Sequence, residues 1–158
     1  MRYWLDTEFI EYPCTIDLIS VGLVAEDGQE FYAESAEVDW SKASPWVLDN
    51  VRPHLTGPVY DRTELRDRIR EFIGPERPEL WGYFCDYDWV AFCWLFGSMV
   101  DLPPGWPMYA MDIKQWAHAL GSPRLPEQGK GEHHALADAR WNRSAWQALA
   151  AVSLGSRR

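Results

Sequence analysis

The chain has 158 residues, a formal net charge of −9, and hydrophobic side chains at 47% of its positions. This length and composition predict one globular domain with a buried core and exclude a largely disordered chain. The sequence contains no apolar run of about 18 residues and no secretory leader, so we expect a cytoplasmic protein with no membrane partner. The acidic balance argues against a protein that coats long nucleic acids, but it leaves open one that holds only a chain end.

Three cysteines (Cys14, Cys85 and Cys93) agree with a cytoplasmic location. They lack CxxC spacing, and their number is odd, so they predict neither a disulfide framework nor a zinc site. We expect free thiols that act as small core or surface residues.

The first part of the chain predicts three strands that follow one another as a meander. Residues 3–10 alternate apolar and polar side chains, which is typical of a strand. A second strand is expected over 17–25. The turn pair Asp27-Gly28 then leads into a third strand over 29–33.

After residue 40 the pattern changes to helices interleaved with strands. Ser44 before Pro45 is typical of a helix start, and Asp61 predicts the cap of a second helix. We expect helices over 45–51, 61–73, 88–96, 112–120 and 134–152, strands over 79–84 and 108–111, and a frayed tail over 153–158. Strands followed by interleaved helices predict an α/β layout with one central sheet, and no linker divides residues 1–158.

Asp6 and Glu8 form a carboxylate pair in the first expected strand. Side chains alternate across a strand, so both acids point to the same face. Apolar neighbours indicate that this strand is central and mostly buried, and a buried acid needs a partner or a metal ion. The alternative is an acidic edge that faces solvent.

Further acids and a histidine lie where segments change from loop or strand to helix. His133 and Asp138 stand at the start of the last expected helix, and an imidazole there can take up a proton near neutral pH. Asp86 and Asp88 follow the expected strand over 79–84. Either acid could serve a site at the strand end or cap the next helix.

These motifs, in this order, resemble the DEDDh 3′–5′ exonuclease family, whose members share an RNase H-like fold. The resemblance rests on Asp6-Thr7-Glu8, Tyr87-Asp88 and the pair His133 and Asp138. Within this family, the sequence is similar in particular to the RNase AS-type polyadenylate-specific 3′-exoribonucleases. That closer resemblance rests on residues 6–11, 18–22, 24–28, 79–81 and 133–140.

The resemblance implies a single RNase H-like domain in which a central mixed sheet, with three antiparallel strands followed by parallel strands, is flanked by helices. It also implies a homodimer that removes nucleoside 5′-monophosphates from the 3′ end of single-stranded RNA. Carboxylates without cysteine ligands suit Mg²⁺ or Mn²⁺. Asp6, Glu8 and Asp138 would hold one ion, and Asp6 with Asp88 a second. His133 would act as the general base.

Two assignments depend on the family pattern. Helical spacing favours His134 as the partner of Asp138, because residues i and i+4 share a face. The family pattern favours His133, five residues before that acid. The pattern also has an aromatic residue directly before the middle acid, which selects Asp88 and leaves Asp86 as a helix cap. It often has an asparagine a few residues earlier, which this chain lacks.

Substrate contacts are expected from three residues: Thr7, Phe9 and Asp112. Phe9 could stack on a terminal base, or it could face the core. Asp112 could accept a hydrogen bond from an adenine amino group, or it could cap the following helix.

An arginine row at four-residue spacing could meet RNA, a second subunit or only solvent. Its members are Arg62, Arg66 and Arg70.

Two other functions compete with an exoribonuclease. The same motifs fit a 3′–5′ exonuclease for single-stranded DNA, because metal-binding acids contact phosphate and not the 2′-hydroxyl. The second competing function is that of an inactive RNase H-like module that only binds nucleic acid. A fold alone does not define an activity.

Overall fold

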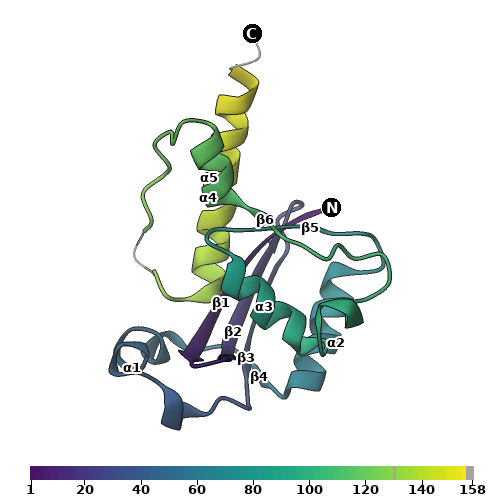
Figure 1. Ribbon diagram of the computed structural model, residues 1–158, viewed down its shortest axis with the longest axis vertical. Helices are drawn as coiled ribbons and strands as arrows, with labels where there is room; N and C mark the ends of the chain where they lie inside the picture. Colours follow the sequence, from purple (N-terminus) through teal and green to yellow (C-terminus); the bar gives the residue numbers. More distant parts are fainter. Residues whose placement is uncertain (130, 156–158) are drawn as a thin grey trace.

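The computed structural model describes residues 1–129 and 131–155, which form one mixed six-stranded sheet with helices on both faces (Figure 1). The strand order is β4-β3-β2-β1-β5-β6. The first three strands form an antiparallel meander, and β5 and β6 run parallel to β1. The strands are β1 (Arg2–Tyr12), β2 (Thr15–Ala25), β3 (Glu30–Ser35), β4 (Val59–Tyr60), β5 (Glu79–Gly82) and β6 (Met111–Asp112). This confirms the central mixed sheet expected from the sequence.

Five α-helices lie within the described residues, and four of them cover the sheet. They are α1 (Pro45–Asn50), α2 (Arg62–Ile73), α3 (Asp86–Leu95), α4 (Ile113–Ala119) and α5 (Ala135–Gly155). Leu5 packs with the buried side chains of α2 and α3, whereas Trp4 packs with those of α4 and α5. Side chains from the first half of β1 therefore alternate between two cores, one on each face of the sheet, and Ile10 near the end of β1 packs with Val47 of α1 in a third. None of the described helices is long and apolar enough to cross a membrane.

The helix starts follow the capping residues in the sequence. The Ser44 hydroxyl accepts a hydrogen bond from the Val47 amide, and the Asp61 carboxylate accepts one from the Glu64 amide. Each bond satisfies a backbone donor that the first turn of a helix leaves free. Both expected caps are confirmed.

Three local expectations were wrong, and one short strand was not expected. The strand expected over 108–111 is the two-residue β6, and β4 is too short to leave a sequence pattern. Asp86 does not cap α3; it is the first residue of that helix, and Cys85 holds the cap position without a side-chain hydrogen bond. Residues 153–155 of the expected tail continue α5, and 156–158 lie outside the described residues.

Among the described residues, the second half of β1 has no strand partner on one side, which leaves an opening in the sheet there. β1 pairs with β5 only from Arg2 to Trp4, and the chain then turns from β5 into α3. On its other side β1 pairs with β2 over its whole length, with a register shift between Glu8 and Phe9. Residues 6–8 therefore lie where α3 and the start of α5 approach β1 from opposite faces (Figure 1).

Candidate active site

Three carboxylates from two elements converge at this opening. Asp6 and Glu8 come from β1, and Asp138 comes from the first turn of α5. One oxygen of each carboxylate lies within 4.8 Å of an oxygen of the other two. The α5 helix covers the face of the sheet to which Asp6 and Glu8 point. Asp138 therefore lies beside the same-face pair expected from the sequence.

Gly22 allows α5 to approach the sheet this closely. It lies opposite Asp6 in the pairing of β1 with β2. A Cβ atom at this position would lie 2.3 Å from the backbone oxygen of Ala135, the first residue of α5. Any side chain here would push the helix away and separate Asp138 from the β1 acids.

Asp88 is a fourth acid, held in place from β1. It lies in the first turn of α3 and is 7% exposed. Its Oδ1 accepts two hydrogen bonds from Thr7, one from the amide at 2.8 Å and one from the hydroxyl at 2.7 Å. Asp86 is exposed at the start of the same helix. The Thr7 side chain is buried and positions Asp88, and its expected contact with substrate stays a prediction.

Burial raises the pKa of each of the four acids, and repulsion from other members of the cluster adds to the shift at Asp6, Glu8 and Asp88. Burial raises the pKa of Asp6 well above its usual range, and repulsion from Asp88, Glu8 and Asp138 adds to this effect. Burial, with repulsion from Asp138 and Asp88, raises the pKa of Glu8 to about 8. Burial raises the pKa of Asp88 to about 6, although its bonds from Thr7 oppose the shift. Burial also raises the pKa of Asp138. The cluster therefore favours either bound protons or a bound cation.

This donor set fits a divalent metal ion. It consists only of carboxylate oxygens, which hard ions such as Mg²⁺ and Mn²⁺ prefer. No ion pair with Lys or Arg is recorded for any of the four acids among residues 1–129 and 131–155. A cation held among them would offset their mutual repulsion.

The two neighbouring histidines have different surroundings. The amide of His133 donates to Asp138 Oδ2 at 2.9 Å, and its ring meets the Trp46 ring edge-on at 4.7 Å. His134 stacks on Tyr32, and its Nδ1 accepts from the amide of Ala137 at 3.4 Å. His134 thus caps α5, and His133 is the histidine whose backbone contacts the acidic cluster.

Two polar residues of this site were missed by the sequence analysis. The buried Asn142 lies one helical turn after Asp138; it donates to the Leu5 backbone oxygen at 2.9 Å and also hydrogen-bonds Asp6. Gln128 Nε2 donates to Asp138 Oδ1 at 2.5 Å. Asn142 could have been noticed as a polar residue within the apolar stripe of the last helix. Gln128 lies in a loop without any such pattern.

Phe9 and Asp112 were the other expected substrate contacts. Phe9 is partly buried, and its ring meets that of Tyr87 edge-on at 5.8 Å. Asp112 accepts hydrogen bonds from the amides of Gln115 and Cys85. Both of its carboxylate oxygens are thus engaged with backbone amides, so the helix-cap alternative describes this residue.

The arginine row on α2 is largely engaged with neighbouring acids. Arg62 binds Asp17 at 2.5 Å, and Arg66 binds Asp67 at 2.9 Å. The Arg62 contact ties the start of α2 to the buried Asp17 of β2, whereas the Arg66 contact lies on the outer face of α2, in agreement with the solvated-face alternative for Arg66.

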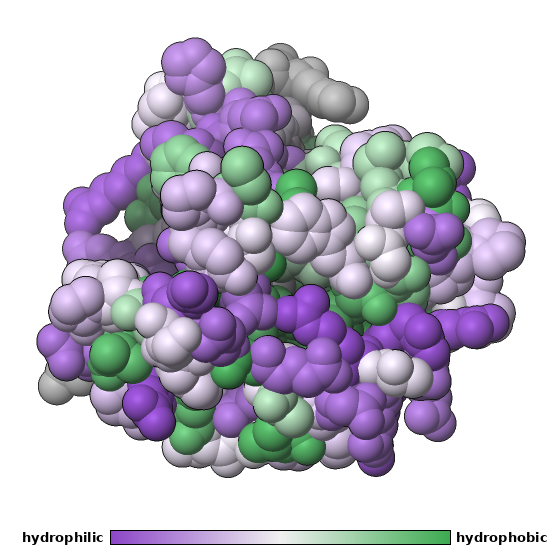
Figure 2. Space-filling view, turned by 60° about the horizontal axis from the view of Figure 1, so that its bottom comes forward, coloured by the Kyte–Doolittle hydropathy of each residue, from purple (hydrophilic) through white to green (hydrophobic). Residues whose placement is uncertain are grey.

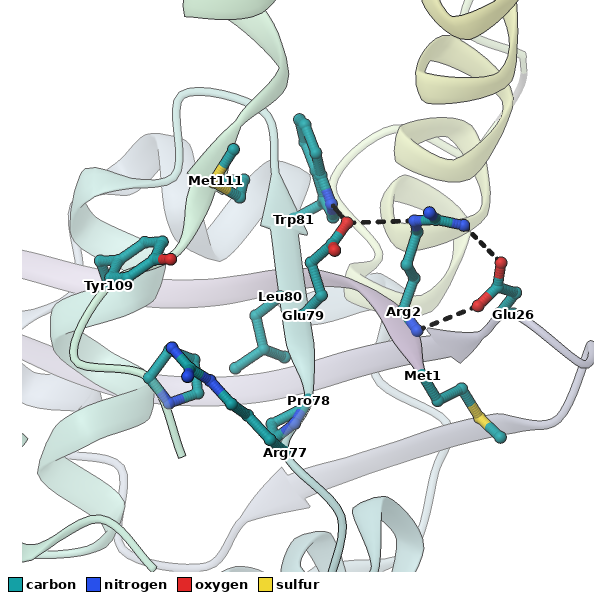
Figure 3. A pocket seen from close by; sticks show the side chains of 11 residues that line it. Met1, Arg2, Glu26, Arg77, Pro78, Glu79, Leu80, Trp81, Tyr109 and Met111 are labelled. Carbon is teal, nitrogen blue, oxygen red and sulfur yellow. Dashed lines mark hydrogen bonds and ion pairs between the residues drawn. The ribbon is translucent and has the colours of Figure 1, made fainter. Parts of the chain in front are cut away.

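A separate pocket of about 580 Å³ opens at the opposite end of the sheet (Figure 3). There Arg2 bridges two acids, Glu26 at 2.5 Å and Glu79 at 3.0 Å, and the Trp81 indole also donates to Glu79. Because its acids are paired with a guanidinium, this pocket does not offer the free carboxylates that a metal site needs.

The surface around the acidic end of the sheet is mixed in character. Figure 2 turns the end that carries α1 toward the viewer, and hydrophilic residues cross its middle between exposed apolar groups. Exposed aromatic side chains near this end include Trp46, Phe84 and Tyr87. The approach to the acids therefore offers both polar and aromatic contacts.

Solved structures of exonuclease I share the fold. One has a TM-score of 0.66 and 12% identity, with 94% of this chain matched to 40% of that chain. Another, E. coli exonuclease I in complex with a dT13 oligonucleotide, has a TM-score of 0.62 and 11% identity over 94% of this chain and 40% of that one. The chain spans about 40% of the length of these proteins. It therefore has an RNase H-like fold with a carboxylate cluster at one end of the sheet.

Comparison with sequences identifies the family. The model of the Rv2179c-like 3′–5′ exoribonuclease domain matches residues 1–150. The chain is 44% identical over 147 residues to the 3′–5′ exoribonuclease Rv2179c of Mycobacterium tuberculosis (strain ATCC 25618 / H37Rv), covering 89% of this chain and 88% of the relative. The 3′–5′ exoribonuclease MT2234.1 of strain CDC 1551 / Oshkosh matches equally well. The chain belongs to this family, and it is a 3′–5′ exoribonuclease.

Proposed function

We propose that this exoribonuclease is a DEDDh enzyme that uses two divalent ions to release nucleoside 5′-monophosphates from the 3′ end of single-stranded RNA. The observation that carries the proposal is the convergence of Asp6, Glu8, Asp88 and Asp138, none of which has a recorded ion pair with Lys or Arg in the part of the chain that the structure describes. Like charges are held this close only where a cation or protons offset the repulsion.

Each acid has a distinct role in the proposal. Asp6, Glu8 and Asp138 would hold one ion, and Asp6 with Asp88 would hold the second. Mg²⁺ or Mn²⁺ held by these residues would supply the positive charge that an in-line displacement at phosphorus requires. Asn142, by its hydrogen bonds to Leu5 and Asp6, keeps the β1 end of the cluster in register with α5.

His133 is the proposed general base. Its imidazole takes a proton from the attacking water, a role typically worth about 10²–10⁴-fold in rate. The hydrogen bond from its amide to Asp138 and the contact of its ring with Trp46 support this assignment. His134 is engaged as the cap of α5, so it is less suited to proton transfer.

The proposed substrate, oligomeric state and location depend less on contacts within the site than the proposed chemistry does. A preference for adenylate-rich RNA, a homodimeric state and a cytoplasmic location rest on the RNase AS resemblance and on sequence composition. Phe9, at the end of the β1 acids, is the proposed contact to the terminal base, because aromatic rings stack on bases of single strands. Its contact with the exposed ring of Tyr87, the residue before Asp88, supports this role.

One assay tests the proposal against its competitors. The purified chain is incubated with 5′-labelled oligo(A), oligo(U) and oligo(dA) in Mn²⁺, Mg²⁺ or EDTA. The proposal predicts metal-dependent shortening from the 3′ end, fastest on oligo(A). Faster loss of oligo(dA) would favour the DNA exonuclease. Full activity in EDTA would refute the metal assignment, and no shortening under any condition would favour the inactive module.

A further inference from the structure

Phe84 combines backbone strain with exposure of an apolar ring. It has a φ of 55°, in the left-handed region that aromatic residues seldom adopt, and it is 63% exposed. Non-glycine residues in that region cost of order 1–3 kcal/mol and tend to occur at ligand-binding sites. Burial of the ring does not explain this conformation, because most of the residue faces solvent.

The surrounding structure holds this turn firmly. Phe84 lies between the end of β5 and the start of α3, and the amide of the next residue, Cys85, donates to Asp112 at 2.9 Å. Asp112 also caps α4, so one carboxylate ties the turn to a second helix. The ring of Phe84 is therefore presented from a fixed backbone.

The turn that holds Phe84 is connected to both helices that carry acids of the site. Tyr83 contacts the Phe84 ring at 4.8 Å and the Trp141 ring at 4.9 Å, and Trp141 lies on α5 three residues after Asp138. In the other direction along the chain, Asp88 follows Phe84 by four residues. Phe84 therefore lies in the turn that leads into α3, the helix that carries Asp88, and Tyr83 links this turn to α5.

A positive charge accompanies the ring. The Lys114 ammonium, from the first turn of α4, lies 5.5 Å from the Phe84 ring centroid. No ion pair of Lys114 is recorded among residues 1–129 and 131–155. In a chain of net charge −9, this lysine is available to an anionic ligand.

We propose that Phe84 is a stacking platform for a nucleobase of the RNA strand upstream of the scissile phosphate, with Lys114 beside the adjoining backbone phosphate. This inference rests on the proposed exonuclease site, because that site determines where the strand must run. A flat exposed ring next to an ammonium group suits a base and its phosphate. Since every base has a π-face, the platform would favour longer strands without selecting a base. The contact would replace the asparagine that the DEDDh pattern often has in this stretch.

Phe84→Asn is the informative variant, because asparagine tolerates the left-handed conformation and removes the ring. Binding of fluorescent oligo(A) is measured by anisotropy in EDTA, where no turnover occurs. We expect about 5- to 150-fold weaker binding, in the range of one lost base–aromatic stack. Phe84→Trp should restore binding. Val100→Ala, which trims another exposed apolar residue, is the matched control and should bind like the unchanged protein.

A second substrate separates this contact from the chemistry. The p-nitrophenyl ester of uridine 5′-monophosphate has a terminal nucleotide and no upstream strand. Phe84→Asn should hydrolyse it at the unchanged rate while losing activity on oligo(A) through a higher KM. Equal loss on both substrates, or unchanged binding of oligo(A), would overturn the inference. If the unchanged protein lacks metal-dependent activity but Phe84→Asn still binds oligo(A) more weakly, the proposed function fails and the platform stands.

Lys114→Gln tests the phosphate contact separately. Removing one contact should lower the slope of log affinity against log salt concentration by about 0.7 for a single strand. An unchanged slope would remove Lys114 from the platform.

Discussion

The two ends of β1 both carry acidic side chains, but they balance charge in opposite ways. At the N-terminal end, Glu26 and Glu79 flank Arg2, which binds both (Figure 3). Further along the same strand, Asp6 and Glu8 face other acids, and burial raises the pKa of each. At the N-terminal end the acids are neutralised by ion pairs with Arg2. At the other end the carboxylates repel one another and have no such partner among the described residues.

This difference in charge balance indicates which end of the strand carries the candidate active site. The neutralised end contains a well-formed pocket, yet its charges are already satisfied. The acidic end lies between α3 and α5, and its excess negative charge is offset by bound protons or by a cation. Charge balance therefore distinguishes the two ends better than the shape of the surface does.

The largest expected effect comes from Asp6→Asn. This change removes a ligand shared by both proposed ions, so turnover of oligo(A) in Mn²⁺ should fall by about 10³-fold or more. In EDTA the variant should melt at or above the temperature of the unchanged protein, because one repelling charge is gone.

Glu79→Gln is the matched control at the neutralised end of β1. It removes one partner of Arg2 and should cost no more than about 1 kcal/mol of stability, with turnover unchanged. Equal activity of the Asp6 and Glu79 variants would remove the functional distinction between the two ends.

The next largest effect is expected from His133→Ala. Loss of the proposed base should slow kcat by about 10²–10⁴-fold with little change in KM. His134→Ala removes the cap of α5 and the ring stacked on Tyr32, which should cost about 1–2 kcal/mol in thermal or urea unfolding and leave turnover nearly intact. The reverse order of the two variants in steady-state kinetics would assign the base to His134.

A smaller effect is expected from Thr7→Val. The hydroxyl bond to Asp88 is lost while the bond from the Thr7 amide remains. Residues that hold metal-binding carboxylates typically contribute about 10–100-fold to metal affinity or activity, so a loss in this range is expected for Mn²⁺-supported turnover. Thr7→Ser keeps the hydroxyl and should retain most activity. Equal losses in both variants would mean that packing, and not this hydrogen bond, is responsible.

The pH dependence of stability should also separate the two ends. The folded-state pKa values of Glu8, about 8, and Asp88, about 6, lie above their ordinary values of 4.5 and 3.8. The folded protein therefore binds more protons than the unfolded chain between these limits, and metal-free stability should fall as the pH rises from about 5 to 8. Thermal unfolding in EDTA at several pH values between about 5 and 8 measures this change in stability.

Glu8→Gln should flatten this pH dependence, whereas Glu79→Gln should leave it unchanged. A metal-free stability that rises with pH in both variants and in the unchanged protein would contradict the account of the acidic end.

The parts of the fold set by neighbouring residues were predictable from the sequence. Ser44 and Asp61 cap their helices through bonds three residues away, and the alternation around Asp6 and Glu8 predicts their common face. The strand expected over 108–111 was misplaced because the short β6 is defined by its partner β5 and not by its own pattern.

The complete site was less predictable, because its geometry depends on contacts between distant segments. Gly22 is an ordinary strand residue in the sequence; its role follows only from the approach of Ala135. Thr7, expected to contact substrate, positions Asp88 because α3 lies against the open edge of β1. Asp88 and Asp138 could be assigned from the sequence only through a family pattern.

Direct titration of the metal-free protein with Mn²⁺, by calorimetry and electron paramagnetic resonance at pH 7, tests the central claim. The unchanged protein and Glu79→Gln should bind Mn²⁺ alike and release protons, because the metal displaces them from carboxylates with raised pKa values. Glu8→Gln should bind much more weakly. Absence of Mn²⁺ binding by the unchanged protein, or equal binding by all three proteins, would contradict a metal site at the acidic end of β1.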